Sequence, residues 1–405
     1  MKTLRQKLLL TGLSFGLLGQ LMGSCQTAAP RPLEITIWLD TNDKEIRYFK
    51  AMASKLRESY PRYRLKLRFI SFDNMKPRFQ GQVGETREPD ILYMMNDWVG
   101  ELVEQNLLRP LTLKNSELTP LSLQSMRYRG KLYGAPFVHQ TLALVYNKNH
   151  VKTPPATPSE ILDLPKHDHK PGAYAMLYDQ GNFYYHAPWF HACGGHLFNK
   201  GKLDIQPQPL IDSIFWAQKL QRENVVPPGS SYSAMVNLFS AGQADLMITG
   251  PWSLSVLDEN ELTYGVAPIP QSDCAGRSRP FAGVKGFGLN QFSENPEAAE
   301  NVIRFLVSEA AQQKALKMLD NLPTHKKVLS QDLPPDKQAF KTQLEQSILM
   351  PNAPVMKYVW QEMNFLLSQA LKPSEGQMMT PAELRTQVNT GLKRLQSEAQ
   401  KYESL

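Results

Sequence analysis

One segment of this sequence has the residue types and spacing of a catalytic motif. Gly12-Leu13-Ser14-Phe15-Gly16 matches the Gly-x-Ser-x-Gly turn that exposes a nucleophilic serine in hydrolases. That turn needs a strand before it and a helix after it, whereas this copy lies in an apolar N-terminal segment. We therefore expect no catalytic serine at Ser14.

A second group has residue types that could hold a metal. Three histidines and one cysteine lie within eleven residues: His186, His191, Cys193 and His196. Five-residue spacing does not place side chains on one helix face, and no second set with zinc spacing accompanies them. The glycines at 283–288 lack the Gly-x-Gly-x-x-Gly spacing of a dinucleotide site. We expect neither a metal nor a cofactor, and we expect the histidines to line a polar cleft or lie on the surface.

The N-terminal segment predicts export. Three basic residues precede the apolar run 8–22, as in a secretory signal. Gly23-Ser24-Cys25 resembles a bacterial lipobox, in which the cysteine is acylated and becomes the mature N-terminus. Residues 1–24 are thus expected to be a lipoprotein signal peptide, with Cys25 anchored to a membrane on the periplasmic or cell-surface side. Cleavage near Ala28-Ala29 is the alternative.

Removal of this segment lowers the net charge of the chain. The 405 residues carry 45 basic and 38 acidic side chains, a net charge of +7. Residues 1–24 hold three of the basic residues and none of the acidic ones, which leaves 42 against 38, or +4. We therefore expect no nucleic-acid partner. With 42% hydrophobic and 20% charged residues, the chain has the composition of one or two globular domains.

The elements that must position a site alternate between strands and helices. A strand at 33–39, a helix at 44–59, a strand at 65–69, a helix around 75–83 and a strand at 90–95 predict a parallel α/β sheet with right-handed crossovers. Further elements follow the same rhythm: helices at 210–224, 232–241, 297–319, 337–349, 355–371 and 381–405, and strands at 244–249, 264–269 and 282–289. This pattern favours two α/β lobes around a ligand cleft.

Motifs at the ends of these elements extend over nearly the whole chain. Gly250-Pro251-Trp252 follows a predicted strand, and other motifs lie at 128–136, 145–148, 280–284 and 350–354, with Trp360 beyond the last. In order and spacing they resemble the family 1 extracellular solute-binding proteins of ABC sugar importers, of the maltose/maltodextrin-binding type. The resemblance covers about residues 34–398.

The resemblance implies a type II periplasmic-binding-protein fold, in which two hinged lobes close over a ligand. It implies an N-lobe of 33–139 plus 285–330, a C-lobe of 142–281 plus 337–405, and crossings near 138–141, 282–286 and 330–336. It also implies binding to ABC permease subunits in the membrane and no covalent chemistry. We expect a monomer.

The resemblance also implies a set of ligand-binding residues. A sugar has an apolar face and a rim of hydroxyls, so its site needs aromatic platforms and polar rim groups. The candidates are Trp252, Trp360, Tyr184 and Tyr185 as platforms, and Asp43, Lys44, Asp97, Trp98, Gln140, Asn182 and Asn364 around them. The alternatives are core packing for the aromatic residues, and helix capping or a solvated charge for the rim groups.

Departures from the family pattern bear on the ligand. Gln140 and Asn182 stand where maltose binders carry Glu, and Asn364 stands where they carry Arg. Met94 replaces a stacking Trp, and Trp98 replaces an Arg. We therefore expect a small neutral glucoside or disaccharide, such as maltose, trehalose, sucrose or glucosylglycerol, rather than a long maltodextrin.

Two other functions remain as alternatives. A lipid-anchored glycosidase would need two carboxylates that flank the scissile bond, and the matched positions carry Gln140 and Asn182. A binding protein for another solute, such as an oligopeptide or a polyamine, would keep the fold and change only the pocket. The sequence also leaves open whether Cys193 and Cys274 pair.

Overall fold

The structure is a computed structural model that describes residues 32–40, 43–113, 116–164, 173–372 and 378–403. The predicted signal peptide, Cys25 and the serine motif lie outside the described residues. Within the described part of the chain, no helix is both long and apolar enough to cross a membrane.

The chain begins with the predicted alternation of strands and helices. The first elements are β1 (Leu33–Leu39), α1 (Asp43–Ser59), β2 (Tyr63–Phe69), α2 (Phe72–Thr86) and β3 (Ile91–Met95). β1 lies between β2 and β3 and runs parallel to both. These boundaries lie within three residues of the predicted ones, because the fold buries apolar side chains of β1, α1, α2 and β3 and partly buries those of β2.

Antiparallel strands complete the first sheet. Its order is β15-β7-β14-β3-β1-β2, with β7 at Gly134–Gln140, β14 at Phe281–Asn290 and β15 at Leu322–Pro323. The short strands β4 (Leu108–Arg109) and β16 (Ile348–Leu349) also pair with β14. All ten residues of β14 are buried, which makes it the central strand of this body.

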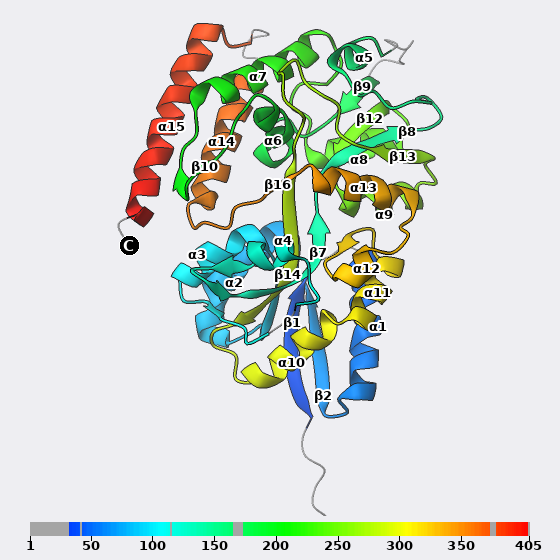
Figure 1. The fold of residues 1–405 in the computed structure, drawn as a ribbon, viewed down its shortest axis with the longest axis vertical. Coiled ribbons are helices and arrows are strands. Elements are labelled where there is room, and N and C mark those ends of the chain that lie inside the picture. The colour runs from blue at the N-terminus through cyan, green and yellow to red at the C-terminus, as the bar shows by residue number, and fades with distance from the viewer. Residues whose placement is uncertain (1–31, 41–42, 114–115, 165–172, 373–377, 404–405) are drawn as a thin grey trace, which may run out of the picture.

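A second sheet has the order β13-β8-β12-β9. Its strands are β8 (Ala143–Asn147), β9 (Tyr174–Leu177), β12 (Ala244–Thr249) and β13 (Tyr264–Ala267). β12 runs parallel to β9 and antiparallel to β8. The two sheets form the centres of two bodies, which we call the first body and the second body in this order (Figure 1).

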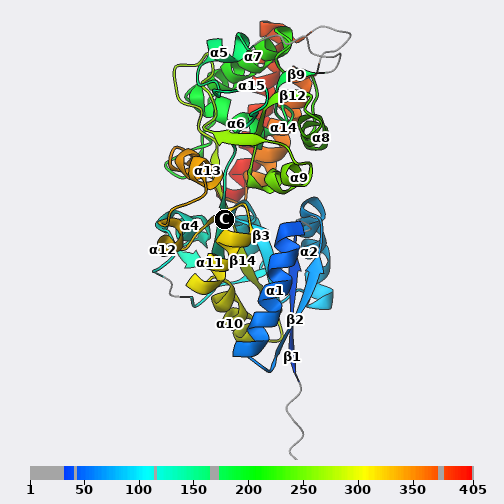
Figure 2. The ribbon, with the colours of Figure 1, turned by 90° about the vertical axis from the view of Figure 1, so that its right-hand side faces the viewer.

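The remaining elements surround these sheets. Those around the first body are η1 (Asn96–Trp98), α3 (Val99–Glu104), α4 (Pro120–Ser125), β5 (Arg127–Tyr128), β6 (Lys131–Leu132), α10 (Pro296–Leu306), α11 (Glu309–Met318) and α12 (Lys326–Leu329). Those of the second body are α5 (Pro158–Leu162), α6 (Phe183–Ala192), β10 (Phe198–Asn199), β11 (Lys202–Leu203), α7 (Pro207–Arg222), α8 (Tyr232–Ser240), η2 (Pro251–Ser253), α9 (Leu254–Glu259), α13 (Pro335–Glu345), α14 (Met356–Leu371) and α15 (Pro381–Glu403). Figure 2 shows the two bodies one above the other from the side.

Two helix predictions were wrong in extent. The helix expected at 297–319 is two helices, because the Ser308 side chain accepts a hydrogen bond from the Ala311 amide and starts α11 anew. The helix expected at 337–349 ends at Glu345, because Ile348 and Leu349 pair with Phe281 and Ala282 of β14. Both errors come from competing hydrogen bonds that an apolar helical pattern does not reveal.

The histidine cluster lies in and beside α6. His186 is fully buried, so the expectation of a cleft-lining or surface position was wrong for this residue, whereas His191 lines a pocket and His196 is exposed. The His186 ring is 3.0 Å from the Ser213 hydroxyl, and the His191 ring is 2.6 Å from the Arg279 carbonyl oxygen. Cys193, at the end of α6, is disulfide-bonded to Cys274 in the loop before β14. The described residues contain no group of three or more His, Cys, Asp or Glu arranged to hold a metal.

Candidate functional site

Four aromatic side chains meet where the second body faces the first. The Tyr184 ring of α6 is 6.2 Å from Trp252, 6.2 Å from Phe281 and 6.4 Å from Trp360, measured between ring centroids. Phe281 and Trp360 are 5.7 Å apart. We call these four rings the aromatic cluster. Three were predicted; Phe281 was not, although it lies in the 280–284 motif.

The local sequence explains how Trp252 reaches this cluster. Gly250 ends the buried strand β12, and Pro251 starts the short helix η2 that carries the indole. A Cβ atom at residue 250 would collide with the Trp252 ring. The glycine therefore lets the indole pack directly over the backbone at the end of the strand.

Two of the predicted amides hold the first turn of α6. The Asn182 side-chain oxygen accepts a hydrogen bond from the Tyr184 amide at 3.0 Å, and the Asn364 side-chain oxygen accepts one from the Phe183 amide at 2.7 Å. Both contacts satisfy amide groups that a helix start leaves without partners. The two amides thus fix the position of Tyr184, and Tyr185 packs beside it with ring centroids 6.0 Å apart.

Asp97 joins the aromatic cluster to the first body. The Trp360 indole nitrogen donates a hydrogen bond to Asp97 Oδ2 at 2.9 Å. Burial raises the pKa of Asp97 to about 6, against the opposing influence of the Lys76 charge and the Trp360 hydrogen bond. The carboxylate lies in η1, directly after β3, where the carboxyl ends of the parallel strands meet.

The Tyr184 hydroxyl is a buried polar atom without a hydrogen-bond partner among the described residues. Burial raises the pKa of Tyr184, and the charge of Asp97 adds to that rise. A buried polar group without a partner costs about 1–3 kcal/mol. A ligand hydroxyl that enters the aromatic cluster would remove this cost.

Lys44 forms a second connection between the bodies. Its Nζ lies 2.8 Å from Asp258 Oδ2 on α9 of the second body and 2.8 Å from Asp320 Oδ1 on the first. The neighbouring Asp43 is exposed in the first turn of α1. Gln140 is buried at the end of β7, opposite Gly283 of β14. None of these side chains takes part in the ring contacts of the aromatic cluster.

Trp98 lies against α2 rather than in the aromatic cluster. It is 5% exposed, and its ring centroid is 5.2 Å from that of Phe72. Met94, which stands at the position of a family Trp, is fully buried. The first body therefore presents no aromatic platform at residue 94.

A buried charge cluster in the first body was not predicted. The Lys285 side chain is 4% exposed, and its Nζ lies 2.8 Å from Asp40 Oδ2 and 3.6 Å from Glu45 Oε2. Burial opposes the charge on Lys285, but Glu45 and Asp40 outweigh it and raise the lysine pKa. Since Asp40 and Lys285 are 245 residues apart in the sequence, local patterns could not have joined them.

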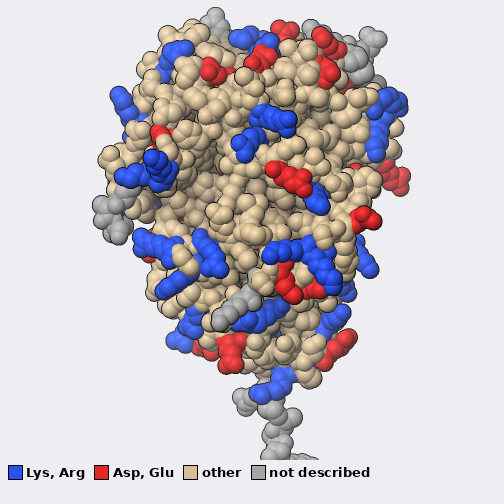
Figure 3. Space-filling view, viewed as in Figure 1, with Lys and Arg blue, Asp and Glu red and all other residues tan. Residues whose placement is uncertain are grey.

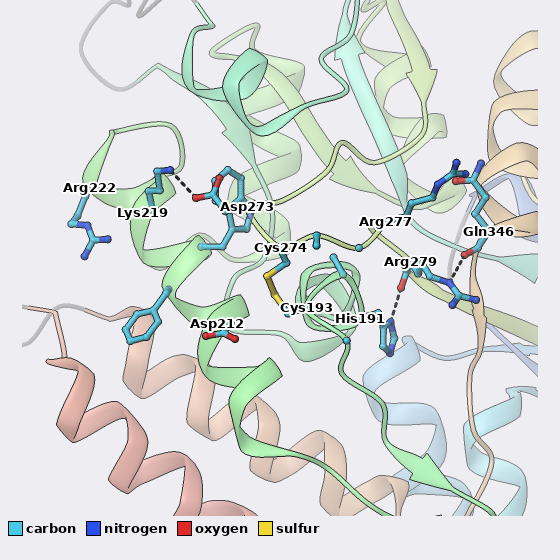
Figure 4. A pocket seen from close by; sticks show the side chains of 16 residues that line it. His191, Cys193, Asp212, Lys219, Arg222, Asp273, Cys274, Arg277, Arg279 and Gln346 are labelled. Atoms are coloured by element: carbon cyan, nitrogen blue, oxygen red, sulfur yellow. Dashed lines mark hydrogen bonds and ion pairs between the residues drawn. A yellow bond between two sulfur atoms is a disulfide. The ribbon is translucent and has the colours of Figure 1, made fainter.

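A pocket of about 1190 Å³ lies elsewhere, over the disulfide of the second body. Figure 4 shows Cys193 and Cys274 between the Lys219–Asp273 ion pair of 2.7 Å and Arg279, whose Nε donates to the Gln346 carbonyl oxygen. None of the predicted ligand-binding residues lines it.

Basic and acidic side chains are interspersed over the face shown in Figure 3, so the positive excess is spread across that face.

The chain is similar in sequence to known binding proteins. Residues 51–342 match the model of the family described as bacterial extracellular solute-binding protein. The maltotriose-binding protein of Pyrococcus abyssi is 25% identical over 359 residues, which cover 84% of this chain and 78% of that protein. The galactooligosaccharide-binding protein of Bacillus subtilis is 28% identical over 294 residues, which cover 67% and 69%.

The fold is similar as well. The structure of the Thermus thermophilus maltotriose binding protein bound with maltotriose aligns with a TM-score of 0.81 at 23% identity, over 90% of this chain and 99% of that one. This likeness confirms the α/β fold of the type II, maltose-binding arrangement. With the family match over residues 51–342, it follows that this chain belongs to the bacterial extracellular solute-binding proteins.

Proposed function

We propose that this chain is the substrate-binding component of an ABC importer and binds a neutral sugar at the aromatic cluster. The observation that carries this proposal is the Tyr184 hydroxyl, a buried donor without a partner among the described residues, on a ring that lies beside the Trp252 and Trp360 rings. Aromatic faces suit the C–H face of a sugar, and a buried hydroxyl suits its rim. The names of the relatives, which bind maltotriose and galactooligosaccharide, support the same ligand class.

The ligand is a small glucoside or a disaccharide, such as maltose, trehalose, sucrose or glucosylglycerol. Met94 is fully buried and cannot stack on a sugar ring. The amide oxygens of Asn182 and Asn364 are engaged at the start of α6. The Asn182 side chain also hydrogen-bonds the Asp179 carboxylate, so Asn182 would support the site through α6, and Asn364 would offer its NH₂ group to a ligand. Gln140 offers a further amide at the end of β7.

Closure of the two bodies over the ligand gives the state that the permease recognises. The N-lobe would comprise 33–139 plus 285–330 and the C-lobe 142–281 plus 337–405, with crossings near 138–141, 282–286 and 330–336. The Trp360–Asp97 and Lys44–Asp258 contacts join the bodies and belong to the closed state. A ligand that contacts both sides stabilises that state by its differential affinity.

A hydrolytic function is the weaker alternative. Glycoside hydrolysis uses two carboxylates that flank the scissile bond. Asp97 is bonded to the indole of Trp360, and the matched positions at 140 and 182 carry amides. The geometry therefore favours binding without cleavage. We propose in addition that the protein acts as a monomer.

Attachment to the membrane is part of the proposal. Cys25 would carry the lipid, and relatives in Streptococcus pneumoniae are named solute-binding lipoproteins. In cells, the wild-type chain should partition into the detergent phase of a Triton X-114 extract, and Cys25→Ala should move it to the aqueous phase. A wild-type chain found only in the aqueous phase would contradict the anchor.

Isothermal titration of the mature protein with sugars tests the ligand class. The panel is maltose, trehalose, sucrose, glucosylglycerol, maltotriose and maltohexaose, with spermidine and a tripeptide as non-sugar controls. We expect saturable binding of at least one of the small sugars and none of the controls. Binding of maltohexaose alone would refute the small ligand, and binding of a control alone would refute sugar transport. Release of monosaccharide during the titration would support the hydrolase.

A further inference from the structure

One edge of the first sheet carries side chains that the proposed site does not use. β1, β2 and β3 run parallel, so their carboxyl ends lie at the same edge. Asp40 follows β1, Phe72 begins α2 after β2, and Asp97 follows β3. Lys285 pairs with Met95 at the end of β3 and so lies at this edge too. Ligands of α/β sheets bind outside the carboxyl ends of the strands.

This edge faces the second body. Asp97 accepts the hydrogen bond from Trp360 of α14. Burial raises the pKa of Tyr232 on α8, and the nearby charge of Asp40 contributes to that rise. The carboxylate that follows β1 therefore lies near the second body, as does the carboxylate that follows β3.

Phe72 presents an aromatic ring at this edge. It is 40% exposed and is one of four large hydrophobic residues exposed in the described part of the chain. The buried Trp98 supports it, with ring planes 35° apart, and the Lys285 Nζ lies 5.7 Å from its centroid. The ring is thus fixed in place while part of it remains accessible.

Asp40 supplies a carboxylate near this ring, because both lie around the Lys285 Nζ, at 2.8 Å for Asp40 Oδ2 and 5.7 Å for the Phe72 centroid. Its side chain is 18% exposed, whereas that of Lys285, its partner at 2.8 Å, is 4% exposed. The buried Lys285 ammonium is paired with the Asp40 carboxylate and keeps it in position. The Tyr93 hydroxyl donates a hydrogen bond to Glu45 Oε1 at 3.1 Å and so fixes the second carboxylate. An ionised carboxylate has acceptor sites for several donors, so Asp40 can bind ligand hydroxyls as well as Lys285.

We propose that Phe72 and Asp40 form a second sugar subsite, in which Phe72 stacks on one pyranose ring and Asp40 accepts its hydroxyls. This subsite replaces the platform that Met94 does not supply, and Lys285 is the positioning residue for Asp40. The inference rests on the proposed sugar-binding function and deepens it, because this subsite and the aromatic cluster together require a ligand of at least two rings.

Calorimetric titration with maltose, trehalose, sucrose and maltotriose tests the subsite with three variants. Phe72→Ala should lower the affinity for the sugar that the wild type binds best by about tenfold, since the stacked ring loses its platform. Phe72→Trp should restore it. Phe292→Ala is the matched control, because Phe292 is 39% exposed but follows β14 at the opposite edge of the sheet. It should bind like the wild type.

Asp40→Ala provides an independent test. We expect a loss of about tenfold in affinity at a temperature where the variant is folded. The melting temperature of the ligand-free variant should fall as well, because the buried Lys285 loses its partner at 2.8 Å. A wild type that binds a sugar while Phe72→Ala binds equally well refutes the subsite and leaves the proposed function intact. A wild type that binds no sugar of the panel refutes both. An equal loss in Phe292→Ala, or no restoration by Phe72→Trp, also counts against the subsite.

Discussion

The Trp360 indole and the Asp97 carboxylate, 263 residues apart in sequence, form a 2.9 Å hydrogen bond between the two bodies. Trp360 is also one of the four rings of the aromatic cluster, at 5.7 Å from Phe281. One side chain therefore takes part in both the proposed sugar platform and the contact that joins the bodies. Changes at this residue should affect ligand affinity and closure together.

Replacement of Trp360 should separate the contribution of its ring to sugar binding from that of its hydrogen bond to Asp97. Trp360→Ala removes the platform and the donor and should lower sugar affinity by at least tenfold, whereas Trp360→Phe keeps a ring and should lose less. Calorimetric titration measures both. Phe365→Ala is the control, because Phe365 lies on the same helix and is 47% exposed. Equal affinity in wild type and Trp360→Ala would remove this residue from the site.

The raised pKa of Asp97 should give stability a dependence on pH. Because burial raises this pKa from 3.8 to about 6, the native state holds the proton more tightly than the unfolded state. The resulting stabilisation is complete below about pH 4 and is lost as the pH rises through 6. Asp97→Asn cannot titrate, so its free energy of unfolding should rise relative to wild type by up to about 3 kcal/mol between pH 4 and pH 7.

Urea unfolding of both proteins at several pH values between 4 and 7 measures this difference. Other titrating groups affect both proteins alike and cancel in the comparison. A difference that stays constant across the pH range would contradict the raised pKa of Asp97.

The Lys44–Asp258 ion pair should contribute to closure in a salt-dependent way. Both side chains are partly exposed, so the pair is worth at most about 1 kcal/mol. Lys44→Met should weaken sugar binding by about two- to fivefold at low salt and much less at 0.5 M salt. Lys66→Met is the control, since Lys66 pairs with Glu34 and Glu88 within the first body. Titrations at the two salt concentrations would detect a salt-independent loss, which would argue against a role in closure.

Removal of the disulfide should lower stability. Cys193 and Cys274 are 81 residues apart, and a bond of this span stabilises a protein by about 2–5 kcal/mol. The double variant Cys193→Ala/Cys274→Ala should therefore unfold at a lower urea concentration. Dithiothreitol should destabilise the wild type and leave the double variant unchanged. Identical unfolding curves for wild type with and without the reductant would contradict the bond.

Much of the fold could be predicted because its signals are local. The strand at 33–39 was predicted from alternating apolar residues, and Ile35, Ile37 and Leu39 are buried. Thr36 and Trp38 are buried too, because β1 lies between two other strands and both of its faces are covered. The break at Ser308 could not be separated from a continuous helix, because the apolar spacing continues on both sides of it.

The candidate site was predictable only in part. Trp252, Trp360 and Tyr184 stand in motifs and meet in the structure. The Asn182 contact is a local helix cap, which is the alternative that the sequence left open. The Asn364 contact depends on how α14 packs against α6, which no local pattern encodes. Lys285 appeared only as one residue of an apolar strand, and its carboxylate partner lies at the other end of the chain.

Strand β14 sets the distance between the two proposed contact regions. Phe281 belongs to the aromatic cluster and Lys285 to the charge cluster, and residues four apart in a strand point to the same face. At about 3.3 Å per residue, their Cα atoms are separated by about 13 Å. That span exceeds a single hexose ring. The strand would thus select ligands by length, because a ligand that reaches from the aromatic cluster to the carboxylates around Lys285 must be longer than one hexose.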